Sequence, residues 1–219
     1  MGERKALVAG ATGLVGGHLV RLLAQRGPVL ALVRRDVPLP EGAVARRVDF
    51  DALVLSRKEL AGADVYCALG TTIRKAGSQA AFRKVDLEAV ANLARAAARG
   101  GARFFGLVSA VGADPSSSVF YSRVKGEAEA AVRASGVPGV GIVRPSFLLG
   151  ERAESRPAEK LGILAAKALG FAMVGPLARY RAVEAEDVAR ALIGLAGGEP
   201  GVRIVESEEI GLRAAPPRT

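Results

Sequence analysis

The sequence has little of the residue types that carry metal and thiol chemistry. Its 219 residues include one cysteine, one histidine and no tryptophan. A single cysteine, Cys67, excludes an intrachain disulfide and the zinc patterns built from several cysteines. A single histidine, His18, argues against a histidine-based metal site and against hydrolases that pair histidine with serine or cysteine. We therefore expect no metal site and no hydrolase of these types.

Positive charge is in excess, with 31 Lys and Arg against 22 Asp and Glu and a formal net charge of +9. Such a balance is typical of proteins that bind nucleic acid or acidic lipids. The arginines, however, form only local pairs, Arg34-Arg35 and Arg46-Arg47, and aromatic residues make up 5% of the chain. Few aromatic side chains are available for stacking on bases, so the composition disfavours a nucleic-acid partner.

No stretch of the sequence has the length and apolarity of a membrane span. The longest apolar stretch, residues 161–175, is interrupted by Lys167 and is shorter than the roughly 20 residues that a span needs. The N-terminal residues lead directly into a short apolar run rather than into a signal-peptide core. These features predict no transmembrane segment and a cytoplasmic location.

Short apolar runs alternate with segments of helical periodicity along most of the chain. The pattern predicts strands over residues 5–9, 29–33, 43–48, 65–69, 104–108, 140–143 and 202–205. It predicts helices over residues 14–25, 79–99, 119–134, 158–169 and 187–195. This alternation is typical of an α/β fold with a doubly wound parallel sheet covered by helices on both faces. We expect a single domain over residues 1–219, in which residues 145–219 form most of a small substrate-side cap.

A glycine-rich turn lies between the first predicted strand and the first helix, as in dinucleotide-binding proteins. The first glycine allows the tight turn, the second lets the backbone approach a pyrophosphate, and the third allows close packing of helix on strand. The helix start offers free N–H groups to phosphates. The predicted cofactor contacts of this turn are Gly10, Thr12, Gly13, Leu14, Val15 and Gly16.

The residues after the second predicted strand favour NADP(H) over NAD(H). An NAD site carries a carboxylate at the tip of this strand, where it binds the ribose 2′-hydroxyl. Here Arg34 and Arg35 follow the strand, and Asp36 comes later. Guanidinium groups suit a 2′-phosphate because they form paired, charge-assisted hydrogen bonds with it.

Tyr121 and Lys125 are four residues apart and share one face of the predicted helix over residues 119–134. An ammonium group beside a phenol favours the phenolate, so the tyrosine is suited to give a proton to a carbonyl oxygen. Ser109 follows the fifth predicted strand and could bind the same oxygen. We therefore predict Tyr121, Lys125 and Ser109 as the catalytic residues, with Lys125 also contacting the cofactor.

The glycine turn, Tyr121, Lys125 and the Arg144-Pro145 pair together resemble the short-chain dehydrogenase/reductase superfamily. Further segments resemble its atypical Tat-interacting-protein branch: Ala68–Thr72, Lys75–Gly77, Ser109–Asp114, Tyr121–Glu127 and Glu154–Pro157. The resemblance spans nearly the whole chain and implies an NAD(P)-binding Rossmann fold. It also implies further cofactor contacts at Asp49, Phe50, Ala68, Leu69, Gly70, Thr71, Val108, Arg144, Pro145 and Ser146. The chain departs from many members of the superfamily at Asp86, where they carry a catalytic asparagine.

Two functions fit these features. The first is an NADPH-dependent oxidoreductase that transfers hydride to a small-molecule carbonyl substrate, with Tyr121 as the proton donor. The alternative is an NADP(H)-binding regulatory or scaffold protein that acts on a protein partner with little or no catalysis. The sequence leaves open whether the protein is a monomer or a homodimer.

Overall fold

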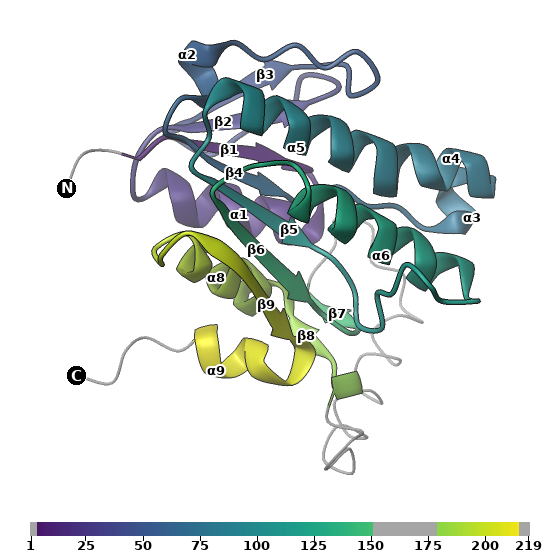
Figure 1. Ribbon diagram of the computed structural model, residues 1–219. Helices are drawn as coiled ribbons and strands as arrows, with labels where there is room; N and C mark the ends of the chain where they lie inside the picture. The colour runs from purple at the N-terminus through teal and green to yellow at the C-terminus, as the bar shows by residue number, and fades with distance from the viewer. Residues whose placement is uncertain (1–3, 151–178, 215–219) are drawn as a thin grey trace.

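The computed structural model describes residues 4–150 and 179–214. These residues form a seven-stranded sheet in the order β3-β2-β1-β4-β5-β6-β9, and every pair of neighbouring strands is parallel (Figure 1). Its strands are β1 (Ala6–Ala9), β2 (Val29–Val33), β3 (Ala43–Arg47), β4 (Asp64–Cys67), β5 (Phe104–Val108), β6 (Gly139–Arg144) and β9 (Gly201–Glu206). A separate parallel pair joins β7 (Leu148–Leu149) to β8 (Val183–Glu184).

Helices cover both faces of the sheet, which confirms the predicted doubly wound α/β fold (Figure 1). One face carries α1 (Leu14–Ala24) and α8 (Ala185–Leu195), and α9 (Ile210–Ala214) packs on α8. The other face carries α4 (Gln79–Arg83), the π-helical turn η1 (Lys84–Glu88), α5 (Ala89–Gly100) and α6 (Phe120–Arg133). Short helices lie in the connections: α2 (Arg57–Leu60), α3 (Ile73–Ala76) and the 3-10 turn η3 (Ser207–Glu209).

The predicted elements agree with the structure in kind and differ in detail. The helix expected over residues 79–99 is interrupted by the π-helical turn, which shifts the register of its side chains by a fraction of a turn. The helix ends at Gly100, and its C-cap Gly101 is in the left-handed conformation at φ +79°. The loop expected at 151–157 and the helix expected at 158–169 lie outside the described residues.

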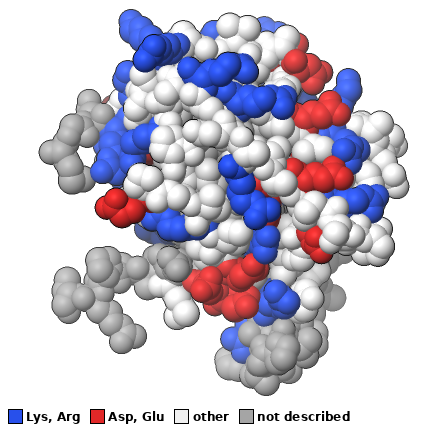
Figure 2. All heavy atoms as spheres, viewed as in Figure 1, with Lys and Arg blue, Asp and Glu red and all other residues white. Residues whose placement is uncertain are grey.

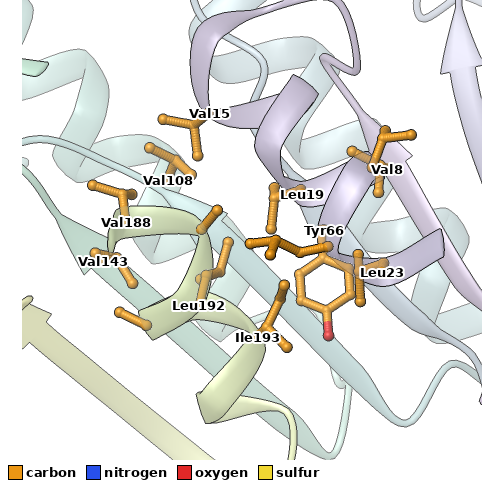
Figure 3. Packing of buried hydrophobic residues seen from close by; sticks show 14 of the residues in the cluster. Val8, Val15, Leu19, Leu23, Tyr66, Val108, Val143, Val188, Leu192 and Ile193 are labelled. Carbon is orange, nitrogen blue, oxygen red and sulfur yellow. The ribbon is translucent and has the colours of Figure 1, made fainter. Parts of the chain in front are cut away.

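Two hydrophobic layers hold the helices on the sheet because the central strands are apolar on both faces. On one side, Leu19 of α1 and Leu192 of α8 are fully buried near Tyr66 of β4 (Figure 3). On the other side, Leu93 of α5 and Val132 of α6 are fully buried in a second cluster. Burial of these side chains fixes both helix layers and therefore the loops at the strand ends.

The sheet order places the topological switch point between β1 and β4. The chain runs from β1 outward to β3 and then returns to β4 on the opposite side of β1. The loops after β1 and β4 therefore leave in opposite directions, and ligands of doubly wound sheets bind between such loops. Within residues 4–150 and 179–214, no helix has the length and apolarity needed to cross a membrane.

Lys and Arg side chains lie over several parts of the face seen in Figure 2, and acidic side chains are interspersed with them on part of it. Several charged side chains of the described residues are paired, as in the 2.8 Å contact between Arg83 of α4 and Glu127 of α6. The excess positive charge is thus distributed over this face rather than gathered into one stripe.

Candidate active site

The glycine turn after β1 has no room for side chains at two of its three glycines. Gly10 has φ +82°, and a Cβ there would lie 2.4 Å from the carbonyl oxygen of Ala68, which follows β4. A Cβ at Gly16 would lie 1.9 Å from the carbonyl oxygen of Gly10. The turn therefore packs directly against both the β4 loop and its own helix, as a dinucleotide-binding turn requires.

Helix α1 begins at this turn without a side-chain cap. Gly13 occupies the N-cap position, its N–H donates to the Gly10 carbonyl at 2.9 Å, and the first turn has no acidic residue. N–H donors of the first turn thus stay available for an anion such as a pyrophosphate. Thr12 is exposed beside them, whereas the side chain of Val15 is buried in the core, so Val15 can offer only its backbone to a cofactor.

The ends of β2 and β3 form an open hollow of about 350 Å³ that contains two arginines. Its lining residues are Arg34, Arg47, Val48, Asp49 and Phe50. Three of these were predicted cofactor contacts, and the structure brings them together; Arg35 is exposed but does not line the hollow. Arg47 was missed because it joins the hollow through the β2–β3 register, in which it lies opposite Val33 at the end of β2. Its one signal in the sequence was the Arg46-Arg47 pair at the end of the third predicted strand.

The loop that follows β3 is held in place from within. The Asp49 carboxylate accepts a hydrogen bond from the Asp51 N–H at 2.9 Å, and the Phe50 carbonyl accepts one from the Asn92 side chain of α5 at 3.1 Å. The Phe50 ring is buried in the core. These contacts fix the floor of the hollow before any ligand binds.

Tyr121 and Lys125 lie one turn apart on α6, as predicted, and differ sharply in exposure. Tyr121 is 38% exposed, and its ring packs on that of Phe82 with centroids 5.7 Å apart. Lys125 is only 7% exposed. Burial acts to lower the pKa of Lys125, but the electrostatic interactions with Asp86 and Tyr121 and the hydrogen bond with Asp86 outweigh it and hold that pKa above its ordinary value.

Asp86, in the π-helical turn, is the partner of the buried lysine. Its Oδ1 lies 2.7 Å from Lys125 Nζ, and its Oδ2 accepts a hydrogen bond from the Thr71 N–H at 2.9 Å. The loop of Ala68, Leu69, Gly70 and Thr71 packs on this pair, since a Cβ at Gly70 would contact Asp86 Oδ1 at 3.5 Å. The predicted cofactor loop and the predicted catalytic helix therefore meet at Asp86.

Ser109 does not offer its hydroxyl proton to a substrate in this structure. Its side chain is buried and donates a hydrogen bond to Glu129 Oε1 at 2.6 Å. While that bond holds, the Ser109 hydroxyl can only accept further hydrogen bonds. The sequence predicts that Ser109 follows the fifth strand, as the structure shows. It does not predict the partner of Ser109, because Glu129 is 20 residues away on α6.

Arg144 is occupied by two carboxylates. Its Nε and Nη2 contact the two oxygens of the fully buried Glu129 at 2.9 and 2.7 Å, and its Nη1 contacts Glu206 of β9 at 2.7 Å. Hydrogen bonds with Glu129 raise the pKa of Arg144 above its ordinary value. The structure thus gives Arg144 a role in joining α6, β6 and β9, whereas the resemblance implied a cofactor contact.

The other predicted contacts near the end of β6 are also joined to neighbouring segments. The Pro145 carbonyl accepts from the Val111 N–H at 2.9 Å, and the Ser146 N–H donates to the Ser207 hydroxyl at 3.1 Å. The Ser146 hydroxyl donates to the carbonyl of Arg181. Val108 is buried at the end of β5.

Comparison with known proteins identifies the family. A family model described as NAD(P)H-binding matches residues 10–196. The chain belongs to the NAD(P)H-binding family. This match includes the glycine turn, the arginine hollow and the Tyr121-Lys125 pair, so it confirms the predicted nucleotide-binding fold.

Curated relatives place this NAD(P)H-binding protein in the HTATIP2-like branch of atypical short-chain dehydrogenase/reductases, as the resemblance implied. It is 38% identical to Protein HTATIP2 of Rattus norvegicus over 169 residues, which cover 74% of this chain and 69% of the relative. It is 31% identical to the mitochondrial protein FMP52 of Coccidioides immitis over 229 residues, covering 93% of each chain.

Solved structures share the fold of this NAD(P)H-binding protein at lower identity. MoeE5 in complex with UDP-glucose and NAD superposes with a TM-score of 0.67 and 21% identity, covering 94% of this chain and 79% of that chain. The UDP-glucose 4-epimerase of Thermotoga maritima superposes with a TM-score of 0.66 and 18% identity, covering 92% and 76%. At these identities the likeness concerns the fold alone.

Proposed function

We propose that this protein is an NADPH-dependent oxidoreductase that reduces a small-molecule carbonyl compound. The observation that carries the proposal is the partly exposed Tyr121, set one helical turn from the buried Lys125, whose ammonium lies next to the loop that packs on the glycine turn. A phenol next to a buried ammonium can release its proton to an oxygen that becomes negatively charged. Bound NADPH would supply the hydride for the carbonyl carbon.

The residues of this chain have separate tasks in such a reaction. The glycine turn and the start of α1 would bind the pyrophosphate, and Tyr121 would protonate the substrate oxygen as the carbon–oxygen π bond breaks. The phenolate left on Tyr121 would be stabilised by Lys125 until it regains a proton from solvent. Ser109 has no assigned step here because its hydroxyl proton is held by Glu129.

A preference for NADPH is supported by the hollow at Arg34 and Arg47. Two guanidinium groups near the end of β2 suit a 2′-phosphate, which carries more charge than a hydroxyl. Titration calorimetry with NADPH and NADH tests this preference. Binding of NADH with equal or higher affinity would contradict it.

The catalytic proposal is tested by following nicotinamide absorbance with a panel of aldehydes, ketones and quinones. We expect NADPH oxidation that Tyr121→Phe lowers at least about 100-fold, the scale of general-acid catalysis, while NADPH affinity stays within about twofold. The matched control is Tyr180→Phe, which makes the same change at an exposed tyrosine that is not among the predicted catalytic or cofactor-binding residues. Equal rates for Tyr121→Phe and the parent protein would refute the proton-donor role.

A second candidate is an NADP(H)-binding regulator with little catalysis. This candidate is favoured because Ser109 and Arg144 both bind the buried Glu129. Ser109 was predicted to be catalytic and Arg144 to contact the cofactor, and these contacts occupy both side chains. Pull-down with and without NADPH tests it, since a regulator should change its partner binding with cofactor. The cytoplasmic location, the protein partner and the oligomeric state stay predictions.

A further inference from the structure

Asp86 is a deeply buried carboxylate that faces two donors from different parts of the fold. It is 1% exposed and lies in the π-helical turn η1. One oxygen lies 2.7 Å from Lys125 Nζ, and the other accepts the Thr71 N–H at 2.9 Å. One oxygen therefore faces the predicted catalytic helix in an ion pair, and the other is hydrogen-bonded to the predicted cofactor loop.

Lys125 needs such a partner because it is buried. Burying an ammonium without a counter-charge is strongly unfavourable, and such a group tends to lose its proton instead. The titratable groups that act on Lys125 are Asp86 of η1, Tyr121 of α6 and Cys67 of β4. Burial raises the pKa of Cys67 to about 12, so this thiol is neutral near neutral pH. Asp86 is thus the group that can supply a standing negative charge.

An asparagine could not perform both tasks of Asp86. A carboxylate has two acceptor oxygens, whereas an amide has one acceptor oxygen and an NH2 donor. The single oxygen of an amide at residue 86 could therefore accept from either the Thr71 N–H or the Lys125 ammonium. Its NH2 group would then face the other of these two donors. It would also remove the negative charge that balances the ammonium.

We propose that Asp86 is a positioning residue that keeps Lys125 charged beside Tyr121 and holds the 68–71 loop against the same pair. The charged ammonium then stabilises the phenolate that Tyr121 becomes after it donates its proton. The catalytic consequence rests on the proposed reductase function, whereas the ion pair itself is open to test in the ligand-free protein.

The direct test follows the protonation of Lys125 by NMR of ¹⁵N-labelled lysine side chains across a pH titration. The signal is assigned with Lys125→Arg, and exposed Lys84 in the same sample is the internal reference. In the parent protein we expect Lys125 to hold its proton at least as strongly as Lys84. In Asp86→Asn we expect its proton affinity to fall at least tenfold, or about one pH unit. The matched control is Glu88→Gln, an exposed carboxylate of the same helical turn, which should leave the Lys125 titration unchanged.

An unchanged Lys125 titration in Asp86→Asn would overturn the proposal. If that variant does not fold, Asp86→Leu, Lys125→Met and the double variant Asp86→Leu/Lys125→Met are compared by urea unfolding. We expect the double variant to be more stable than the sum of the single losses implies, by at least tenfold in the unfolding equilibrium constant. If the stability losses of the two single variants add up to that of the double variant, the pairing of Asp86 with Lys125 is refuted.

A further measurement separates the positioning role from the reductase function. If the parent protein reduces a carbonyl compound, we expect Asp86→Asn to lower kcat at least tenfold and to alter its pH profile, because Lys125 then titrates. An unchanged kcat across pH would overturn the positioning role. If the parent protein reduces no carbonyl compound, the proposed function fails, and the NMR titration still decides the role of Asp86 toward Lys125.

Discussion

Arg144→Met is expected to destabilise the protein strongly, because it leaves a buried carboxylate without its counter-charge. Glu129 is fully buried, and the guanidinium of Arg144 contacts both of its oxygens at 2.9 and 2.7 Å. After the substitution, only the Ser109 hydroxyl would still donate to Glu129 among the described contacts. Removing one partner of a buried ion pair costs about 3–5 kcal/mol. That is a large part of the roughly 5–15 kcal/mol that stabilises a typical domain.

Urea unfolding followed by circular dichroism measures this loss as a lower midpoint at constant slope. For a chain of this length the melting temperature should fall by about 6–20 °C. NADPH affinity should change less than about twofold below the melting range if Arg144 serves the internal network rather than the cofactor.

Two variants control the interpretation. Glu206→Gln weakens the outer contact of Arg144, and since Glu206 is partly exposed we expect a loss below about 1 kcal/mol. Glu129→Met/Arg144→Met replaces both buried charges with apolar side chains and should recover much of the stability that Arg144→Met loses. A loss below about 1 kcal/mol for Arg144→Met, or a double variant less stable than Arg144→Met, would refute the reasoning.

Three further predictions concern the cofactor turn, the arginine hollow and the buried thiol. Gly16→Ala should lower both stability and NADPH affinity, because its Cβ would lie 1.9 Å from a backbone oxygen. Gly17→Ala should be tolerated, because the nearest atom to its Cβ would be 3.8 Å away. Calorimetry measures the NADPH affinity of each variant, and thermal melting measures its stability. Arg34→Ala and Arg47→Ala should each weaken NADPH binding about tenfold or more and leave NADH binding nearly unchanged, and equal losses for both cofactors would contradict a 2′-phosphate site. Cys67 is fully buried with a pKa raised to about 12, so an aromatic disulfide reagent should react with it only after urea is added; rapid labelling of the native protein would contradict this burial.

Features that depend on neighbours in the sequence could be predicted well. The glycine turn is a local pattern bounded by an apolar strand and a helix, and the Tyr121-Lys125 pair follows from helical periodicity. The short helix α2 was missed although it has a local signal. Ser56 and Glu59 form a capping box there, the spacing that marks a helix start.

Features that depend on contacts between distant segments could not be predicted in this way. Asp86 and Lys125 are 39 residues apart, and Arg144 and Glu206 are 62 residues apart, so their pairing depends on how η1, α6, β6 and β9 pack. The π-helical turn has the same cause, because the propensities of residues 84–88 do not distinguish it from an α-helix. Arg47 reaches the arginine hollow through the β2–β3 register, which only the folded sheet defines.

Helix α6 combines these two kinds of information along one line of side chains. Tyr121, Lys125 and Glu129 follow at intervals of four residues and are 38%, 7% and 0% exposed. The line therefore passes from the solvent-facing site into the core, and each step meets a different partner: the Phe82 ring, the Asp86 carboxylate and the Arg144 guanidinium. A substitution of Tyr121 should alter the proposed chemistry, and one of Lys125 should alter the charge at the site. A substitution of Glu129 should alter the stability of the fold. The buried ion pair with β6 fixes the inner end of this helix, and the helix in turn sets the position of Tyr121, the proposed proton donor.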